Sequence, residues 1–394
     1  MGTLNIPIRS WVLALGTFAV GTDAFVVAGF LPEMAAALRV SEAAAGQSVT
    51  VFALAYAIGS PIMATLTARL PRRLLLVTAL VVLGLANLGS ALAPSLPVLI
   101  ATRVLAALGA AAYTPNAGAV AASLTTPQAR ARALSIVVGG LTLATALGVP
   151  LGNLAAQQLS WRGALALVAV LSLAAAPAVH AVLPEAPGSP AVPLRTRLAV
   201  LRHPAVLRVL PLTVLGMGAA YTAYAYSVPA LEGVGVRAIG LMLFLYGAGA
   251  VAGNMVSGYA TDRWGAGHVL TAGYTVMALA MGALAWIAAS GAAVPVLAGV
   301  LSAAWGASSW CQTPAQQHRL ITAAPAEAAL VVSLNSSAIY AGIGLGTVLG
   351  GLVLASGVAF LYGAAALLAT ASLAVALSTT RAAATPAGSR SSDR

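Results

Sequence analysis

Asp23 is the residue whose type and position could do chemistry, because it is the acidic side chain deep inside a long apolar run. An ionised carboxylate at the centre of a lipid-embedded helix costs at least about 2.5 kcal/mol, so it needs a partner, a watery cavity or a proton. Arg103 stands inside another apolar run and is a suitable partner, because a guanidinium stays protonated. Two interpretations are open. A carboxylate that gains and loses such a partner can carry a proton, or the two residues form a static pair.

Other polar and aromatic side chains in the later apolar runs are candidates for lining a substrate cavity. Their alternative role is structural, since Tyr and Trp at span ends anchor helices at the interface and Asn joins helices to one another. The candidates are Tyr221, Tyr224, Asn254, Trp305, Gln312 and Asn335.

The residue inventory excludes several classes of chemistry. All 19 basic residues are arginine, so the lysine of a P-loop and the lysine of a Schiff base are absent. Cys311 is the single cysteine, and the 4 histidines have no ligand-like spacing, so we expect no metal or other cofactor. No nucleophile stands with a base in the apolar runs, and an enzyme is therefore not expected.

The composition predicts a membrane protein built from helices. Hydrophobic residues make up 60% of the 394 positions and charged residues 7%, against about 25% charged in a soluble domain. Runs long enough to cross a bilayer, at about 20 residues each, predict an all-α fold with twelve transmembrane helices. They lie near 10–31, 46–68, 73–93, 97–122, 133–156, 163–183, 206–231, 238–261, 267–289, 292–317, 328–351 and 355–378.

The arginines explain the net charge of +11 as an orientation signal. With a cytoplasmic N-terminus, 15 of the 19 fall on the cytoplasmic side, and only Arg39, Arg162 and Arg237 fall outside. The positive-inside rule therefore predicts that both termini are cytoplasmic. A nucleic-acid partner is not expected. A cleaved signal peptide in the first run is the less favoured alternative, because losing one span would break the alternation of charge.

The runs divide into two halves of six. Residues 184–204 are rich in Pro and Arg and predict a cytoplasmic linker between an N-terminal bundle at 1–183 and a C-terminal bundle at 205–380, with a disordered cytoplasmic tail at 381–394. The halves resemble repeats: 59–69 aligns with 253–263 at an offset of 194, and Gly148 aligns with Gly346 at 198. Parallel repeats are a transporter architecture with the substrate site between the halves.

Four stretches resemble the major facilitator superfamily, in its twelve-span drug:proton antiporter branch of arabinose-efflux-permease-like, chloramphenicol-resistance-like and purine-efflux-like exporters. They are GTDAFVVAGFLPEMAAAL at 21–38, the loop motif with Gly258, Asp262, Arg263 and Gly265, Arg103 in its span, and GVPLGN at 148–153 followed by SWR. The resemblance covers about residues 10–380.

The sequence departs from the family pattern in two places. The first-half loop motif keeps Arg69, Arg72 and Arg73, but Ala64 and Ala68 replace its glycine and aspartate. A gating contact by a carboxylate must then come from Asp262 or be absent. Beside Arg103, Ala106 and Ala107 replace the family's glutamine and glycine, which removes a polar relay along that span.

The resemblance implies a monomeric exporter in a bacterial inner membrane that exchanges a small, amphipathic molecule for protons by alternating access. Asp23 and Arg103 would couple the proton. Gly148, Pro150 and Gly152 would serve the conformational change, although close packing alone also explains them. The alternative function is uptake, by symport or uniport, of a sugar or a nucleoside-like metabolite.

Overall fold

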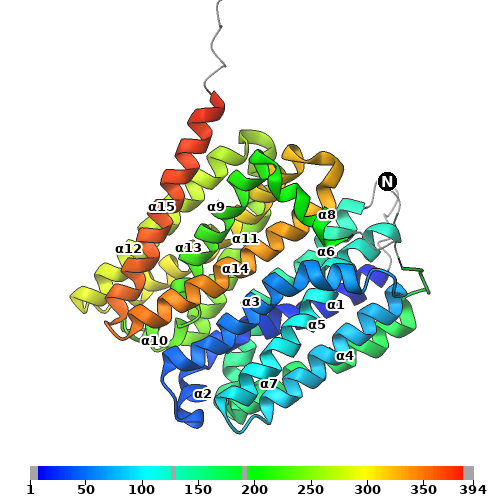
Figure 1. Cartoon of the computed structure of the whole chain (residues 1–394). Helices are drawn as coiled ribbons and strands as arrows, with labels where there is room; N and C mark the ends of the chain where they lie inside the picture. Colours follow the sequence, from blue (N-terminus) through cyan, green and yellow to red (C-terminus); the bar gives the residue numbers. More distant parts are fainter. Residues whose placement is uncertain (1–7, 126–129, 189–192, 385–394) are drawn as a thin grey trace, which may run out of the picture.

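The computed structural model describes residues 8–125, 130–188 and 193–384, and within them it contains helices and no strands. The first half of the chain forms the group that is coloured blue to green in Figure 1. Its elements are α1 (Ile8–Phe25), the 3-10 turn η1 (Val26–Gly29), α2 (Leu31–Leu38), α3 (Glu42–Leu66), α4 (Arg72–Ala91), α5 (Leu96–Ser123), α6 (Arg130–Leu143), the π-helical segment η3 (Ala144–Gly148) and α7 (Val149–Val182).

The second half forms a separate group beside the first, coloured green to red. Its elements are α9 (Pro204–Tyr224), α10 (Ser227–Glu232), α11 (Ile239–Trp264), α12 (Ala266–Ser290), α13 (Pro295–Ala323), η5 (Pro325–Glu327), α14 (Ala328–Leu354) and α15 (Val358–Ala384).

The predicted twelve spans are present. In the described residues, 10 helical stretches are long and apolar enough to cross a membrane. One of them, Ala133–Val182, has 50 residues. At 1.5 Å per residue it would run to about 75 Å, far more than the roughly 30 Å hydrocarbon core. Ser160, with φ 75°, breaks its helical path into two spans. The helix α13 has 29 residues and is the twelfth span, whose Ser and Gln residues lower its hydropathy.

Corresponding helices pack alike in the two halves, which confirms the two pseudo-symmetric six-helix bundles. A Cβ at Gly148 would lie 2.3 Å from Thr22 Oγ1, so η3 rests directly on α1. In the second half, a Cβ at Gly350 would lie 2.1 Å from Thr222 O, so α14 rests directly on α9. Small residues permit this close approach of helix backbones in lipid.

The segment between the bundles contacts the first residues of α4. It contains the short helix α8 (Leu194–Ala199) and the turn η4 (Val200–Arg202). The backbone N–H of Arg72 donates to Ala186 O at 2.9 Å, and Arg73 forms an ion pair with Glu185. At the other end of the chain, α15 continues to Ala384, so the first residues of the predicted tail are helical, and the rest of the tail lies outside the described residues.

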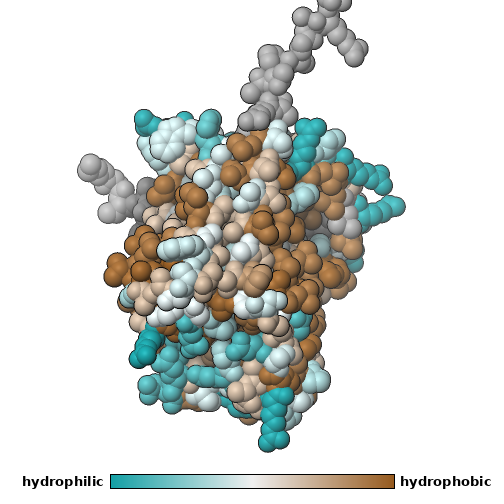
Figure 2. All heavy atoms as spheres, turned by 90° about the vertical axis from the view of Figure 1, so that its left-hand side faces the viewer, coloured by the Kyte–Doolittle hydropathy of each residue, from teal (hydrophilic) through white to brown (hydrophobic). Residues whose placement is uncertain are grey.

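The surface agrees with a multi-pass membrane protein. Figure 2 shows hydrophobic residues over the middle of one face and hydrophilic residues gathered toward its ends. Exposed apolar side chains such as Leu279 and Leu367 supply part of the apolar surface.

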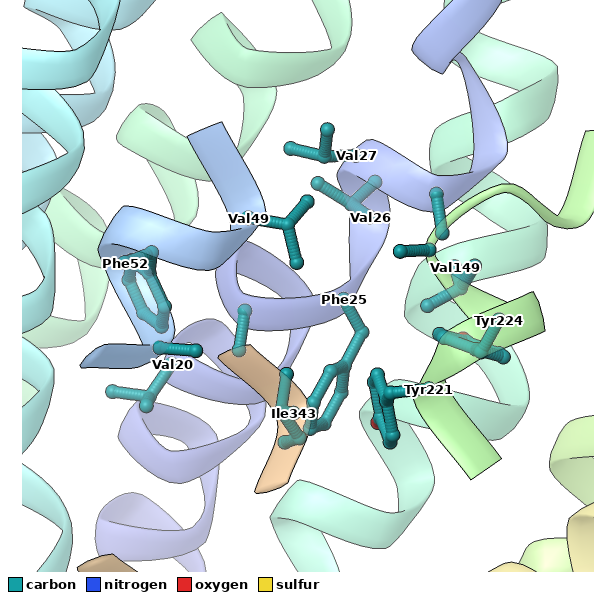
Figure 3. Packing of buried hydrophobic residues seen from close by; sticks show 14 of the residues in the cluster. Val20, Phe25, Val26, Val27, Val49, Phe52, Val149, Tyr221, Tyr224 and Ile343 are labelled. Atoms are coloured by element: carbon teal, nitrogen blue, oxygen red, sulfur yellow. The ribbon is translucent and has the colours of Figure 1, made fainter. Parts of the chain in front are cut away.

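The two bundles meet tightly at the end of the molecule where α2 and α10 lie (Figure 1). Phe25 of α1 packs against Tyr221 of α9, with ring centroids 5.9 Å apart (Figure 3). Tyr226 donates to Thr347 O at 3.0 Å, and its hydroxyl fills the space above Gly46 and Gly351. This end is therefore closed.

Candidate functional site

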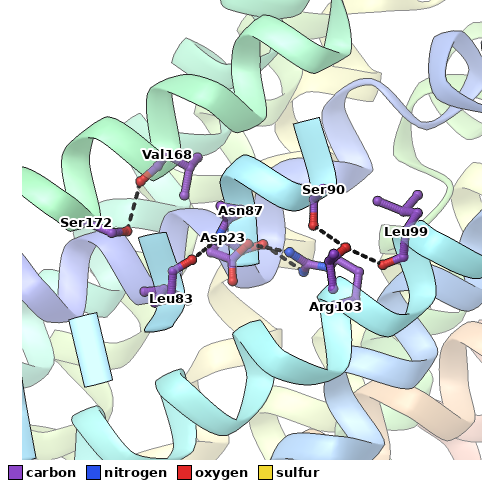
Figure 4. Close-up of polar contacts among 9 residues, drawn as sticks. Asp23, Leu83, Asn87, Ser90, Leu99, Arg103, Val168 and Ser172 are labelled. Carbon is purple, nitrogen blue, oxygen red and sulfur yellow. Dashed lines mark hydrogen bonds and ion pairs between the residues drawn. The ribbon is translucent and has the colours of Figure 1, made fainter. Parts of the chain in front are cut away.

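Asp23 and Arg103 form an ion pair in the interior of the first bundle (Figure 4). Both side chains are 0% exposed. Arg103 donates from Nη1 to Asp23 Oδ1 and from Nη2 to the backbone oxygen of Asp23 at 3.1 Å. Asn87 of α4 lies beside them and donates to Leu83 O at 3.0 Å. The two residues that the sequence predicted as partners are thus in direct contact.

A layer of aromatic rings separates this pair from the space between the bundles. The Phe52 ring covers the Arg103 guanidinium at 4.3 Å from Cζ. Phe52 contacts Tyr340 of α14, with ring centroids 6.3 Å apart, and Tyr340 stacks on Tyr56 at 3.8 Å. Phe52 and Tyr340 thus form a chain of contacts from the ion pair to the second bundle.

A central cavity of about 490 Å³ lies between the bundles. Its lining comes from the second halves of α5 and α13, the first half of α14 and most of α6, together with residues of α1, Tyr56 of α3 and Asn254 of α11. The lining halves of α5, α13 and α14 lie toward the end of the molecule where α1 begins. The cavity is therefore on the side of the arginine-rich loops, opposite the closed end.

The glycines of the 148–153 motif hold the broken helix of the fifth span against the first span. A Cβ at Gly152 would lie 2.0 Å from Val26 Cγ2. Pro150 is the second residue of α7, which begins directly after the π-helical segment, and its missing N–H removes a backbone hydrogen bond there. A Cβ at Gly247 of α11 would lie 2.3 Å from Ala146 Cα, so the second bundle also touches this segment. The motif thus lies where both bundles meet.

The arginines of the first-half loop motif contact residues that lie outside that motif. Arg72 donates to Asn116 Oδ1 at 2.9 Å, and Arg73 pairs with Glu185 of the linker. Arg69 is exposed, and its backbone packs against Gly188.

The second-half loop motif stands at the end of α11. Asp262 is exposed and makes no ion pair with any residue of the described chain. Arg263 donates to Tyr259 OH at 3.0 Å, and Gly258 has open space around its Cα. Gly265 joins α11 to α12 with φ 84°, a backbone conformation that favours glycine. The charge contact assigned to Asp262 is thus not made in this conformation.

Of the six residues that the sequence suggested for a substrate cavity, Asn254 lines the central cavity. The remaining predicted residues lie behind its wall, within the second bundle. Tyr221, Tyr224 and Trp305 belong to a buried aromatic cluster, in which the Tyr224 and Trp305 centroids are 6.0 Å apart. Gln312 accepts from Tyr274 OH at 3.0 Å.

Asn335 also lies behind the wall, where it accepts from Thr213 at 3.0 Å. Its contact to substrate remains a prediction, as do those of Gln312 and the aromatic cluster.

Several lining residues did not stand out in the sequence. Tyr56, Tyr340 and Gln317 line the cavity, and Phe52 covers Arg103. The only signal for the first of these was the spacing of Phe52 and Tyr56, one helical turn apart on one face of α3. That spacing does not tell a cavity wall from a bundle core.

Comparisons with known proteins agree with this arrangement. The family profile described as Major Facilitator Superfamily matches residues 13–237. The chain is 31% identical over 346 residues to an uncharacterized MFS-type transporter, YbcL, of Bacillus subtilis (strain 168), covering 87% of this chain and 88% of that protein. It is 30% identical over 364 residues to the inner membrane transport protein YdhP of Escherichia coli (strain K12), covering 91% of each. It is 33% identical over 363 residues to a chloramphenicol resistance protein of Streptomyces lividans, covering 89% of each.

Solved structures share the fold at low identity. A D-xylose-proton symporter superposes with a TM-score of 0.75 at 17% identity, covering 93% of this chain and 96% of the symporter. A bacterial homologue of the human lysosomal transporter Spinster, in an inward-facing and occupied conformation, has a TM-score of 0.72 at 16% identity, covering 94% and 96%.

Proposed function

We propose that this chain, which belongs to the Major Facilitator Superfamily, exports a small, amphipathic molecule in exchange for protons. The observation that carries the proposal is the buried Asp23–Arg103 pair, one aromatic layer away from the cavity between the bundles. The relative named for chloramphenicol resistance favours export over uptake.

In the proposed cycle, a proton and Arg103 compete for the Asp23 carboxylate. Protonation removes the charge that holds the guanidinium and leaves it only the weaker contacts with the backbone oxygen of Asp23 and with the Phe52 ring, from which it can then withdraw. Because Phe52 touches Tyr340 of the second bundle, this movement would alter the contact between the two bundles. One proton that moves down about 100 mV supplies about 2.3 kcal/mol to the exchange.

The proposal includes the placement of the chain in the membrane. Both termini would be cytoplasmic in a bacterial inner membrane, with bundles at 1–183 and 205–380 and the linker at 184–204 between them. The cavity would then open to the cytoplasm, and the uncontacted Asp262 would belong to an open gate. A monomer would suffice, because each chain holds both bundles.

The test is the release of protons from acidified inverted vesicles on addition of amphenicols, purine nucleosides, sugars and lipophilic cations, one at a time. The expected result is a compound-specific collapse of the pH gradient that is lost in Asp23→Asn. The matched control is Glu33→Gln, which neutralises an exposed carboxylate and should keep the collapse. An unchanged collapse in Asp23→Asn would remove Asp23 as the proton carrier. Counterflow of a sugar or nucleoside without any pH gradient would instead support the uptake alternative.

A further inference from the structure

A second hollow, of about 970 Å³, opens on the side of the molecule between the two bundles. It lies among α1, α6, α11 and α13, and we call it the side opening. Its rim carries exposed apolar side chains: Leu143 and Met255 (71% exposed) inside their spans, and Trp11 (57% exposed) at the start of α1. The positions inside the spans place Leu143 and Met255 at the depth of lipid chains.

The side opening borders the central cavity. Residues from α6, α11 and α13 line both hollows, so the wall between them is a single layer of side chains. The shared residues are Leu134, Val138, Thr142, Asn254, Thr313 and Gln317. Beside them, a Cβ at Gly139 would meet no atom within 4 Å, which shows that the space is unfilled.

The equivalent seam on the opposite side of the molecule is sealed. There α3 meets α14, and Tyr56 stacks on Tyr340 with ring centroids 3.8 Å apart and planes at 23°. The repeat offsets of 194 and 198 relate these two positions to Ala250 on α11 and Thr142 on α6. The seam with the side opening thus has small side chains where its counterpart has two stacked rings: Thr142 lines the side opening, and Ala250 is buried next to the lining residue Val251.

The lining indicates the kind of molecule that fits. Among the described residues that line either hollow, none carries a charge. The polar groups are amides and hydroxyls, and the hydroxyls of Thr313 and Tyr340 are buried without a hydrogen-bond partner. Such groups suit a neutral molecule with hydrogen-bonding atoms, whereas an ion would be desolvated here without compensation.

We propose that the side opening admits an uncharged, lipophilic molecule from the bilayer directly into the central cavity. The proposal rests on the proposed transport function and specifies its substrate class and route. A route through the bilayer concentrates lipophilic molecules before they bind, and it excludes charged solutes because they do not partition into lipid.

The first test measures the side opening itself, without transport. In a Cys311→Ser background in lipid nanodiscs, a nitroxide is placed by Val138→Cys in the side opening or by Leu279→Cys on the exposed face of α12. The nitroxide at 138 should collide with both dissolved oxygen, which favours lipid, and a water-soluble nickel complex, because it faces both bilayer and cavity. The nitroxide at 279 should collide with oxygen alone. Collision with the nickel complex alone at 138 would overturn the proposal.

The second test uses benzophenone, an uncharged lipophilic ketone that cross-links to C–H bonds on illumination. Dissolved in the bilayer, it should label the cavity face of α14 around Ile339. Gly139→Phe places a ring in the side opening, next to Val138, and should lower this labelling at least about twofold, because the ring narrows the passage. The control Gly282→Phe places the same ring in open space on α12 and should leave it unchanged.

Equal labelling of α14 in Gly139→Phe and in the parent protein would overturn the proposal, as would absence of labelling in the parent. Neither test requires transport, so failure of the exporter function is recognised separately in the vesicle assay.

Discussion

Replacing one member of the Asp23–Arg103 pair should cost more stability than replacing both. Arg103→Gln leaves a fully buried carboxylate without its cation, which costs about 3–5 kcal/mol. Asp23→Asn should lie at the lower end of this range. Arg103 would keep its bond to the backbone oxygen at residue 23 and the Phe52 ring at 4.3 Å, contacts worth about 1–2 kcal/mol together. The double variant removes both charges and should cost less than either single variant, so the coupling energy should be about 3 kcal/mol or more.

Thermal unfolding in detergent, followed by the fluorescence of the 6 tryptophans, measures these differences. At about 2–4 °C per kcal/mol, Arg103→Gln should lower Tm by at least about 6 °C, and the double variant should melt above it. The control is Glu185→Gln, which breaks the exposed pair with Arg73 and should change stability by less than about 1 kcal/mol. Additive losses from the two single variants would refute the reasoning, because independent residues have no coupling energy.

Three further predictions use the same melting assay. Gly152→Ala should cost about 1–3 kcal/mol, because its methyl group would overlap Val26 of η1, whereas Gly282→Ala faces open space and should not destabilise. Equal effects of the two substitutions would contradict the packing. Tyr226→Phe should cost about 1 kcal/mol of stability, because the Tyr226 hydroxyl donates a hydrogen bond. Tyr340→Phe should be neutral, because the buried Tyr340 hydroxyl has no hydrogen-bond partner. A larger loss in Tyr340→Phe than in Tyr226→Phe would contradict these hydrogen-bond assignments. Ser160→Gly should stabilise the protein by about 1 kcal/mol, since glycine adopts φ 75° without strain. A loss of stability would show that the fold needs the serine side chain at this position.

Apolar run length and small-residue spacing were sufficient to predict the helices and their pairing into two halves. Each predicted run corresponds to a helix, because in lipid every backbone polar group must be satisfied within the segment. The boundaries differ where the backbone bends inside a span. After Phe25 the first span changes to a 3-10 turn, and near Ser160 two spans join without the expected loop. Hydropathy does not record such bends.

The ion pair was predictable because only a few residue types tolerate burial in lipid. Asp23 had to find a cation, and Arg103 was the arginine inside a span. The cavity wall was harder to predict, because Tyr, Asn and Gln can face a cavity or a neighbouring helix equally well. Asn254 faces the cavity, while Gln312 is held by Tyr274, and only the rotation of each helix about its own axis decides between these outcomes.

The stacked Tyr56 and Tyr340 rings have a mechanical consequence. Two rigid bodies that remain attached along one edge have one easy motion, a swing about that edge, and the opposite edge then travels farthest. If the α3–α14 edge acts as this hinge, the α6–α11 edge moves most, and the glycines and the π-helical turn of Ala144–Gly148 lie on the moving side. The stacked rings would then mark the axis of the motion, and the contact between Gly247 and Ala146 on the opposite edge would separate as the bundles swing apart.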